Sequence, residues 1–302
     1  MSDPAAEPGA PSSGAVDIPP ASEKSVAAEA KKRAPKVTSL AATPDRVLLR
    51  LNKLLASPGG LSSFLSTFNY TLYLLTYLES KSAPLKMRLY QLLNRTAAVP
   101  ALNAGPSNIA ALGSMLSTTR TTLRLFGLLP LYAWLRQLMQ GPKPGQDQVL
   151  YTTAVTQCLL YISFQFLENV GLLTDNKVLP ASYTARWTRS SGGTTAKIYL
   201  WSYRAWMGGV VCDIVRLFRE AQLERSKRAR RAGTTDVSTR EEDEKSDQQW
   251  WSQMVVPMSW LPVAVQFSKE GGIPGFNLGI MGACGGLAGL GRTADLWAAT
   301  AE

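Results

Sequence analysis

The chain has no histidine among its 302 residues, and this absence excludes several kinds of active site at once. Without an imidazole there is no Ser-His-Asp triad, no Cys-His pair and no histidine-ligated zinc. Cysteine is scarce as well, because Cys158, Cys212 and Cys284 lie far apart and form no C-x-x-C motif. A disulfide framework is therefore not expected, and a reducing compartment fits best. With no paired carboxylates, phosphate loop or nucleophile elbow either, we predict no catalytic residue, no metal, no cofactor and no enzyme activity.

Strand signals are lacking too. No stretch combines sustained apolar alternation with hairpin turns, whereas the apolar period is helical through residues 44–223. The sequence therefore predicts an all-α protein. Residues 1–43 are rich in Pro, Ala and Ser and hold no aromatic residue, so we expect a disordered tail that is not a secretory signal.

Positive charge is the first feature that the sequence does have. The formal net charge is +10 at pH 7, and most of this surplus falls between Asp45 and Gln140. Such a chain favours anionic partners, which means nucleic acid or phospholipid headgroups.

The helix that we expect from Pro44 carries apolar and basic residues on adjacent faces. Thr43 supplies an N-cap and Pro44 a first-turn proline. At 100° per residue the apolar side chains share an arc of about 120°. They are Val47, Leu48, Leu51, Leu54 and Leu55, and the basic residues beside them are Arg46, Arg50 and Lys53. The pattern predicts a helix that binds a membrane surface.

A second helix, predicted from Ser107 toward Leu129, repeats this design. Leu123 and Phe126 belong to its apolar arc, and Arg120 and Arg124 stand at the edge of that arc. An apolar stripe bordered by arginines is typical of an interfacial helix whose guanidinium groups reach lipid phosphates. An ordinary bundle helix with a solvated basic edge shows the same pattern and is the alternative.

Two regions are candidates to enter a bilayer. Residues 148–167 are uncharged and long enough to span, although three glutamines also fit a buried core helix. The C-terminal region 250–298 opens near two tryptophans and contains the uncharged run Gly271–Gly291. We expect this region to be a Gly-rich membrane anchor. Its G-x-x-x-G spacings predict close helix packing and self-association through Gly275, Gly279, Gly282, Gly286 and Gly289. A flexible Gly-rich loop is the alternative.

Between these regions, residues 224–249 first turn basic and then acidic, which predicts a charged linker after a helix end. The basic cluster consists of Arg225, Lys227, Arg228, Arg230 and Arg231. It matches a nuclear or nucleic-acid patch, but beside apolar helices we interpret it as a juxtamembrane targeting cluster attracted to anionic lipid.

The order of these motifs resembles a known family. Asp45-Arg46-Val47-Leu48 opens the first basic helix and Thr119-Arg120 leads into the second. Leu167-Glu168-Asn169-Val170-Gly171, an aromatic basic helix at Trp201–Phe218 and the Gly-rich run to Leu296-Trp297 follow. Over residues 44–298 the chain resembles the peroxisomal biogenesis factor 11 (peroxin-11) family, and more closely its fungal gamma-like branch. It departs from the family in its long N-terminus and in the charged insertion.

The resemblance implies a single- or multi-pass peroxisomal membrane protein with its N-terminus facing the cytosol. Its amphipathic helices would insert into the cytosolic leaflet, elongate the organelle and lead to fission. The implied partners are the anionic phospholipid membrane, further copies of the chain, the peroxisomal membrane-protein import receptor and the dynamin-related fission machinery. A small-solute pore is the alternative function. A nucleic-acid-binding module is less favoured because of the long neutral C-terminal runs, so no nucleic-acid partner is predicted.

Overall fold

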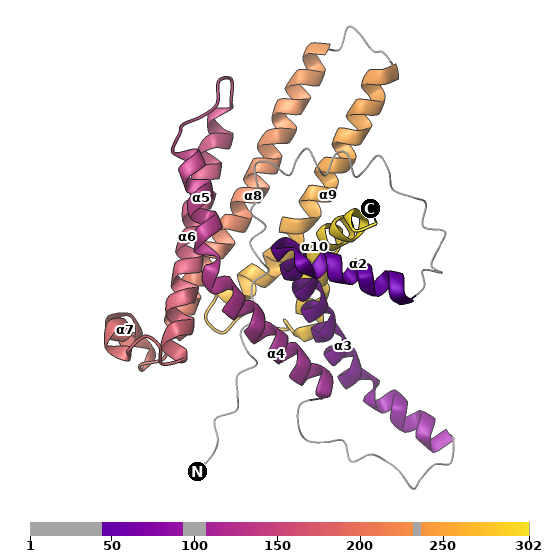
Figure 1. The fold of residues 1–302 in the computed structure, drawn as a ribbon, viewed down its shortest axis with the longest axis vertical. Coiled ribbons are helices and arrows are strands. Elements are labelled where there is room, and N and C mark those ends of the chain that lie inside the picture. The colour runs from indigo at the N-terminus through magenta and orange to yellow at the C-terminus, as the bar shows by residue number, and fades with distance from the viewer. Residues whose placement is uncertain (1–43, 93–106, 232–236, 302) are drawn as a thin grey trace. The chain divides into compact units, whose positions relative to one another are not determined.

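The structure is a computed structural model that describes residues 44–92, 107–231 and 237–301 (Figure 1). Within these ranges all regular structure is helical and no strand occurs. The all-α prediction is confirmed. The predicted tail at 1–43 lies outside the described residues.

Nine α-helices make up the described part of the chain. In order they are α2 (Pro44–Ala56), α3 (Pro58–Leu92), α4 (Asn108–Leu123), α5 (Leu128–Leu138), α6 (Gln148–Asp175), α7 (Ala181–Thr188), α8 (Ala196–Arg231), α9 (Val237–Ser268) and α10 (Leu278–Ala299). Single 3₁₀ turns, η2 (Arg124–Phe126) and η3 (Arg189–Ser191), follow α4 and α7. Side-chain caps start several of the helices: Asp147 accepts hydrogen bonds from the first free amides of α6, and Asn277 does so for α10. Ser57 and Ser107 each accept one such bond at the start of α3 and α4.

The described helices divide into two compact units. The first unit contains the described residues up to Thr122 together with those from Pro274 onward, and the second contains Leu123–Ile273. This grouping differs from the predicted organisation, in which 44–223 formed one region and 250–298 another. The C-terminal helix α10 packs with α3, far from it in sequence, and α9 packs with α8. Sequence composition shows where polar segments interrupt the chain, but not which helices pair across them.

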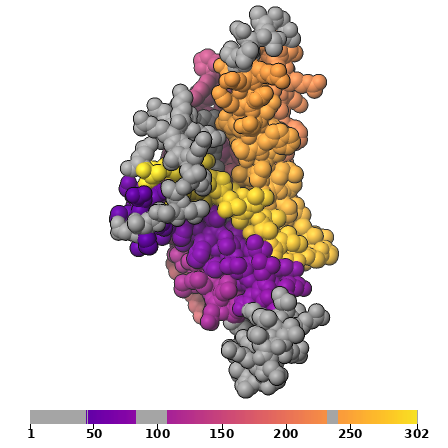
Figure 2. All heavy atoms as spheres, turned by 90° about the vertical axis from the view of Figure 1, so that its right-hand side faces the viewer, coloured from indigo at the N-terminus to yellow at the C-terminus, as the bar shows by residue number. Residues whose placement is uncertain are grey.

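In the first unit α10 lies along α3 (Figure 2). The two helices approach so closely at Gly282 that a β-carbon there would collide with the backbone of Leu74 and Tyr70. Hydroxyl groups add a polar contact, because Thr293 Oγ1 lies 2.8 Å from Ser63 Oγ. Close backbone contact therefore fixes α10 against α3.

In the second unit α6 packs along α8, and α8 packs along α9 (Figure 1). Phe164, Leu217 and Val263, one from each of these helices, are fully buried. Ser202 Oγ donates a 2.9 Å hydrogen bond to the Phe164 carbonyl and thereby links α8 to α6. The core of this unit is thus a three-helix stack, to which α5 adds a further side along α6.

The predicted linker at 224–249 is wrong for the residues that the structure describes. Helix α8 continues to Arg231 and α9 begins at Val237, so only 232–236 falls outside the description. Arg228 joins the two helices, with its Nη2 2.8 Å from Asp247 Oδ1 and its Nε 3.3 Å from Asp243 Oδ1. The basic and acidic halves of the segment face each other, which a linear pattern of charge does not reveal.

Candidate membrane interface

Helix α2 is divided along its length into an exposed half and a docked half. Val47 and Leu48 in the first half are 40% and 64% exposed. Leu54 is buried, and Leu51 and Leu55 are half-buried where α2 meets α3 and α10. Of the predicted apolar arc, the structure therefore leaves its N-terminal residues free to meet a membrane.

The basic residues of α2 differ in the same way. Arg46 and Lys53 are exposed. Arg50 instead binds the end of α10, where its Nη2 donates a 2.6 Å hydrogen bond to the Trp297 carbonyl and its Nε a 3.1 Å bond to Thr300. Its guanidinium carbon also lies 4.4 Å from the Trp297 ring centroid. Arg50 thus fastens α2 to the first unit, while Arg46 and Lys53 keep their charges at the surface.

Arg120 is not at a lipid-facing edge, and that prediction is wrong. The side chain is buried, with 5% exposed, and its Nη2 donates a 2.8 Å hydrogen bond to Ser66 Oγ on α3. Its guanidinium also lies over the ring of Tyr70. The spacing placed Arg120 beside an apolar arc correctly, but the arginine side of the helix is the one that faces the protein.

Helix α4 buries small and polar residues and leaves part of its apolar surface exposed. Its buried positions are Gly113, Ser117 and Arg120. Leu112 is 37% and Met115 60% exposed, whereas Ile109 and Leu116 are half-buried. Ser114 and Thr118 are exposed as well, so the outward side of α4 has mixed polarity. Because removing apolar area from water is the main driving force of folding, the exposed Leu112 and Met115 suit an apolar surrounding.

Arg124 is also directed into the protein, where its half-buried side chain is 11% exposed in the second unit. Its Nη2 lies 2.7 Å from Glu168 Oε1, and the Glu168 side chain is 2% exposed. The neighbouring apolar residues meet the expectation, since Leu123 is 46% and Phe126 69% exposed. Here too the apolar residues lie outside and the arginine lies inside.

Further exposed apolar residues on α5 were missed by the sequence analysis. Leu129 and Tyr132 are 69% and 62% exposed, and Met139 is 71% exposed. The signal was present, because Phe126, Leu129 and Tyr132 recur at every third position. It was hidden by Pro130, which suggested the end of a helix where α5 in fact contains the proline in its first turn.

One helix in the described ranges, α6, is long and apolar enough to cross a membrane. It has 28 residues and so measures about 42 Å, more than the hydrocarbon thickness of about 30 Å. Only 28% of its most apolar stretch is buried within the structure, whereas the core helix of a soluble protein is mostly buried. The predicted candidate span at 148–167 lies entirely within this helix.

The polar side chains of α6 bond within the protein. Gln157 Nε2 donates a 3.1 Å hydrogen bond to the Gly209 carbonyl of α8. Gln165 Nε2 donates to Asn169 Oδ1 at 2.9 Å, and Asn169 donates to the Leu125 carbonyl at 3.0 Å. Such pairing is what a helix needs before its remaining surface can face lipid. It also occupies Gln157 and Gln165, two of the three glutamines in the predicted span.

An ion pair stands at the N-terminal end of α6. Arg219 Nη2 on α8 lies 2.8 Å from Asp147 Oδ2, and Asp147 Oδ1 accepts hydrogen bonds from the amides of Val149 and Leu150. The hydrogen bond from Arg219, aided by the backbone amides, holds the pKa of Asp147 below its usual value. The charged pair marks where the uncharged part of α6 begins.

The C-terminal region differs from the expected anchor. The uncharged run Gly271–Gly291 is not one helix, because α10 begins at Leu278, after a loop. The uncharged part of α10, from Leu278 to Gly291, is about 21 Å long and ends at Arg292, which is short for a span. An anchor at 250–298 remains a prediction, and α6 is the helix with the length and composition for it.

The glycines of this region pack within the chain. Gly279, Gly282 and Gly289 face Tyr77, Leu74 and Thr67 of α3. The other two predicted packing residues do not take part: Gly275 lies in the loop before α10, and neither it nor Gly286 has a neighbour within 4 Å of an added β-carbon. Three of the five glycines therefore serve the α3–α10 contact within one chain, and their use between two copies stays a prediction.

The basic cluster at the end of α8 is partly engaged. Arg228 pairs with Asp243 and Asp247 of α9. Arg225, Lys227 and Arg230 are exposed, as is Arg231. Lys227 Nζ lies 3.6 Å from Glu224 Oε2, and Arg228 links α8 to α9. The cluster is therefore partly used within the protein, although most of its side chains are exposed.

No group of three or more His, Cys, Asp or Glu side chains within 44–92, 107–231 and 237–301 is arranged to hold a metal ion. The three thiols are free, with Cys158 buried and Cys212 and Cys284 half-buried. The candidate functional feature of the described residues is therefore their exposed apolar surface, which consists of leucine, methionine and aromatic side chains.

Comparison with known proteins agrees with a membrane-associated chain. The sequence model of the family described as peroxisomal biogenesis factor 11 (PEX11) matches residues 87–297, more than two thirds of the chain. The match includes α4 to α9 and most of α10, but not α2. Searches of curated proteins and of solved structures gave no match. The chain belongs to the peroxisomal biogenesis factor 11 family and is a peroxisomal membrane protein involved in peroxisome proliferation.

Proposed function

We propose that the chain elongates the peroxisomal membrane by inserting the apolar sides of α2 and α4 into the cytosolic leaflet, and so promotes fission. The observation that carries this proposal is that α4 exposes apolar residues while it buries an arginine: Met115 is 60% exposed and Arg120 only 5%. Burying a charge while exposing apolar side chains is unfavourable in water. A lipid surface would remove the cost of exposing Leu112 and Met115 to water, because it provides an apolar surrounding for these side chains.

Shallow insertion also supplies the mechanism of bending. An interfacial helix lies about 5–10 Å deep, at the boundary between headgroups and acyl chains. Val47 and Leu48 of α2 would enter this layer, with Arg46 and Lys53 remaining at the phosphates of anionic lipids. Added volume in one leaflet expands that leaflet relative to the other and favours curvature.

Helix α6 is the proposed anchor, with the N-terminus of the chain in the cytosol. Its length and its exposed apolar surface support this role. Self-association and contact with the dynamin-related fission machinery belong to the same proposal. Self-association would use a face other than the three glycines that face α3, because α3 covers Gly282.

The exposed basic residues at the end of α8 would act as a targeting cluster. Arg225, Lys227 and Arg230 would meet the membrane-protein import receptor before insertion and anionic headgroups afterward. Each basic residue near an anionic surface contributes about 1 kcal/mol of attraction. Arg228 is engaged with α9, so its charge would contribute least.

Reconstitution of the full chain into anionic giant vesicles tests the insertion of α4. The double variant Leu112→Glu/Met115→Glu places charges at the exposed apolar positions of α4. We expect tubules, counted by electron microscopy, to be lost while the chain stays in the vesicles through α6. The matched control is Gln248→Glu/Gln249→Glu, which adds the same charge at exposed polar positions of α9, outside α4. Equal tubulation by the first variant and the parent would contradict the proposal.

A further inference from the structure

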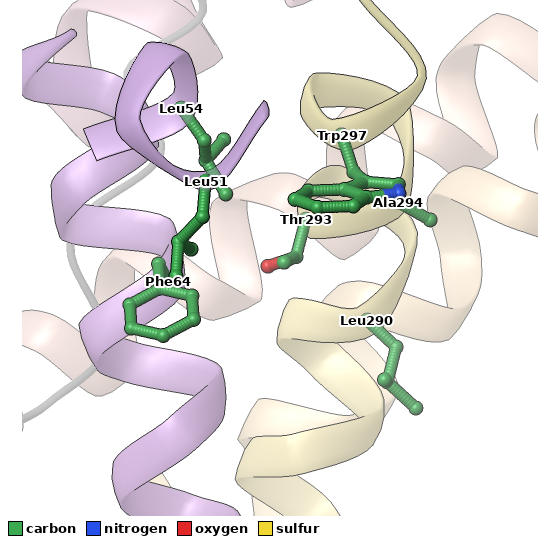
Figure 3. Close-up of a pocket in the computed structure, with 7 residues that line it drawn as sticks. All are labelled: Leu51, Leu54, Phe64, Leu290, Thr293, Ala294 and Trp297. Atoms are coloured by element: carbon green, nitrogen blue, oxygen red, sulfur yellow. The ribbon is translucent and has the colours of Figure 1, made fainter. Parts of the chain in front are cut away.

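The first unit contains an apolar pocket of about 290 Å³ between α2, α3 and α10 (Figure 3). Its walls come from parts of the sequence that lie far apart. Helix α2 contributes Leu51 and Leu54, α3 contributes Phe64, and α10 contributes Leu290, Ala294 and Trp297. The volume is at the lower end of the range for small-molecule sites, so the pocket suits a slender occupant.

The interior of the pocket is almost purely hydrocarbon. Thr293 is its one hydroxyl-bearing side chain, and its Oγ1 lies 2.8 Å from both Ser63 Oγ and Thr67 Oγ1. The hydroxyl is thus already hydrogen-bonded to α3 and does not call for a polar group in the pocket. The part of an occupant that lies inside the pocket would be recognised by its apolar surface.

The surroundings of the pocket are basic. The guanidinium carbon of Arg50 lies 4.4 Å from the ring centroid of Trp297, one of the pocket walls. Arg46 and Lys53 are exposed on the same helix. Asp295, next to Ala294, is the acidic residue on this side of α10. An open apolar pocket on a helix that also carries exposed cations is complementary to a molecule with a hydrocarbon chain and an anionic head.

We propose that this pocket binds one acyl chain of an anionic membrane phospholipid, with the phosphate near the basic residues of α2. The inference rests on the proposed function, since it gives the helix that meets the bilayer a defined lipid contact. A bound acyl chain would join α2, α3 and α10 through contacts with all three helices. The first unit would then bind a single lipid molecule specifically, in addition to binding the membrane surface.

Photolabelling of the full chain tests this site. The probe is phosphatidylserine with a diazirine on an acyl chain, mixed into phosphatidylcholine vesicles that hold the chain. We expect adducts at Phe64 and Trp297, mapped by mass spectrometry. Ala294→Phe should fill the pocket and lower these adducts about tenfold, which corresponds to excluding roughly two methylene groups. The control Ala298→Phe changes an exposed position of α10 outside the pocket and should leave them unchanged.

The outcomes separate this inference from the proposed function. Equal labelling of the Ala294→Phe variant, the control and the parent would overturn the pocket assignment, even where tubulation is normal. Better competition by free fatty acid than by unlabelled phosphatidylserine would overturn the phospholipid assignment. Loss of labelling in Ala294→Phe with normal tubulation supports the pocket alone, whereas the α4 variants test insertion without altering the pocket.

Discussion

Arg120 of α4 lies over Tyr70 of α3, with its guanidinium carbon 5.3 Å from the ring centroid. The same guanidinium donates a 2.8 Å hydrogen bond to Ser66 Oγ. These contacts turn the small and polar side of α4 toward α3. They leave Leu112 and Met115 on the outside. The contacts of one buried arginine thus help to decide which residues of α4 are exposed.

Replacing Arg120 by methionine should destabilise the first unit. The change removes a hydrogen bond from a charged donor and a cation–π contact, which together contribute about 2–4 kcal/mol. Circular dichroism of the chain in detergent should show a lower Tm. The exposed Arg136 provides the control, and Arg136→Met should leave Tm nearly unchanged. An unchanged Tm for Arg120→Met, with weaker binding to anionic vesicles, would instead restore the lipid-facing interpretation.

The two glycines Gly282 and Gly286 should respond oppositely to leucine. At Gly282 a side chain meets the backbone of α3, so Gly282→Leu should cost about 3 kcal/mol or more and separate α10 from α3. At Gly286 a β-carbon finds open space, and Gly286→Leu should be neutral or raise Tm slightly through helix propensity. Thermal unfolding of the two variants provides the measurement. Equal destabilisation by both would show that the glycines of α10 do not pack as described.

Introducing charged residues into α6 or into α10 should show which of the two helices anchors the chain in the membrane. Leu159 and Phe166 of α6 are 50% and 48% exposed, and Ile280 and Leu287 of α10 are 40% and 53% exposed. Arginine at both α6 positions opposes spanning by about 2.5–3.5 kcal/mol each near a bilayer centre. Carbonate extraction should therefore release the α6 double variant. The α10 double variant, matched in type and exposure, should stay in the membrane pellet, and the reverse pattern would identify α10 as the anchor.

The pair of Asp147 and Arg219 should make stability depend on pH in acid. Hydrogen bonding to Arg219 lowers the pKa of Asp147 in the folded chain, whereas an unfolded aspartate titrates near about 3.9. A group with a lowered pKa stabilises the fold above its unfolded pKa, and this contribution is lost as pH falls through the folded pKa. The parent should therefore have a higher Tm than Asp147→Asn at pH 6, with the difference shrinking below about pH 4.

The partner residue supplies the check on that interpretation. Arg219→Gln removes the same ion pair while leaving the cap of α6 in place, so its deficit in Tm should shrink over the same range of pH. A deficit for either variant that stays constant from pH 6 to pH 3 would show that the ionised carboxylate does not stabilise the fold.

The sequence by itself determined the helical character of the chain and much of its chemistry. Continuous apolar periodicity without strand alternation predicted the all-α fold. The uncharged run at 148–167 located the one described helix that can span a membrane. The absence of histidine and the surplus of basic residues favoured a membrane protein over an enzyme. These conclusions hold because composition and spacing act locally, on one helix at a time.

Only the tertiary structure decided what each helical face meets. The pattern placed Arg120 beside an apolar arc, but burial showed that the arginine faces α3 while Leu112 and Met115 are exposed. The G-x-x-x-G spacing predicted close packing, but the partner at Gly282 is α3 of the same chain. Periodicity states which residues share a side of a helix. Whether that side meets protein, water or lipid depends on residues far away in the sequence, which come together only in the folded chain.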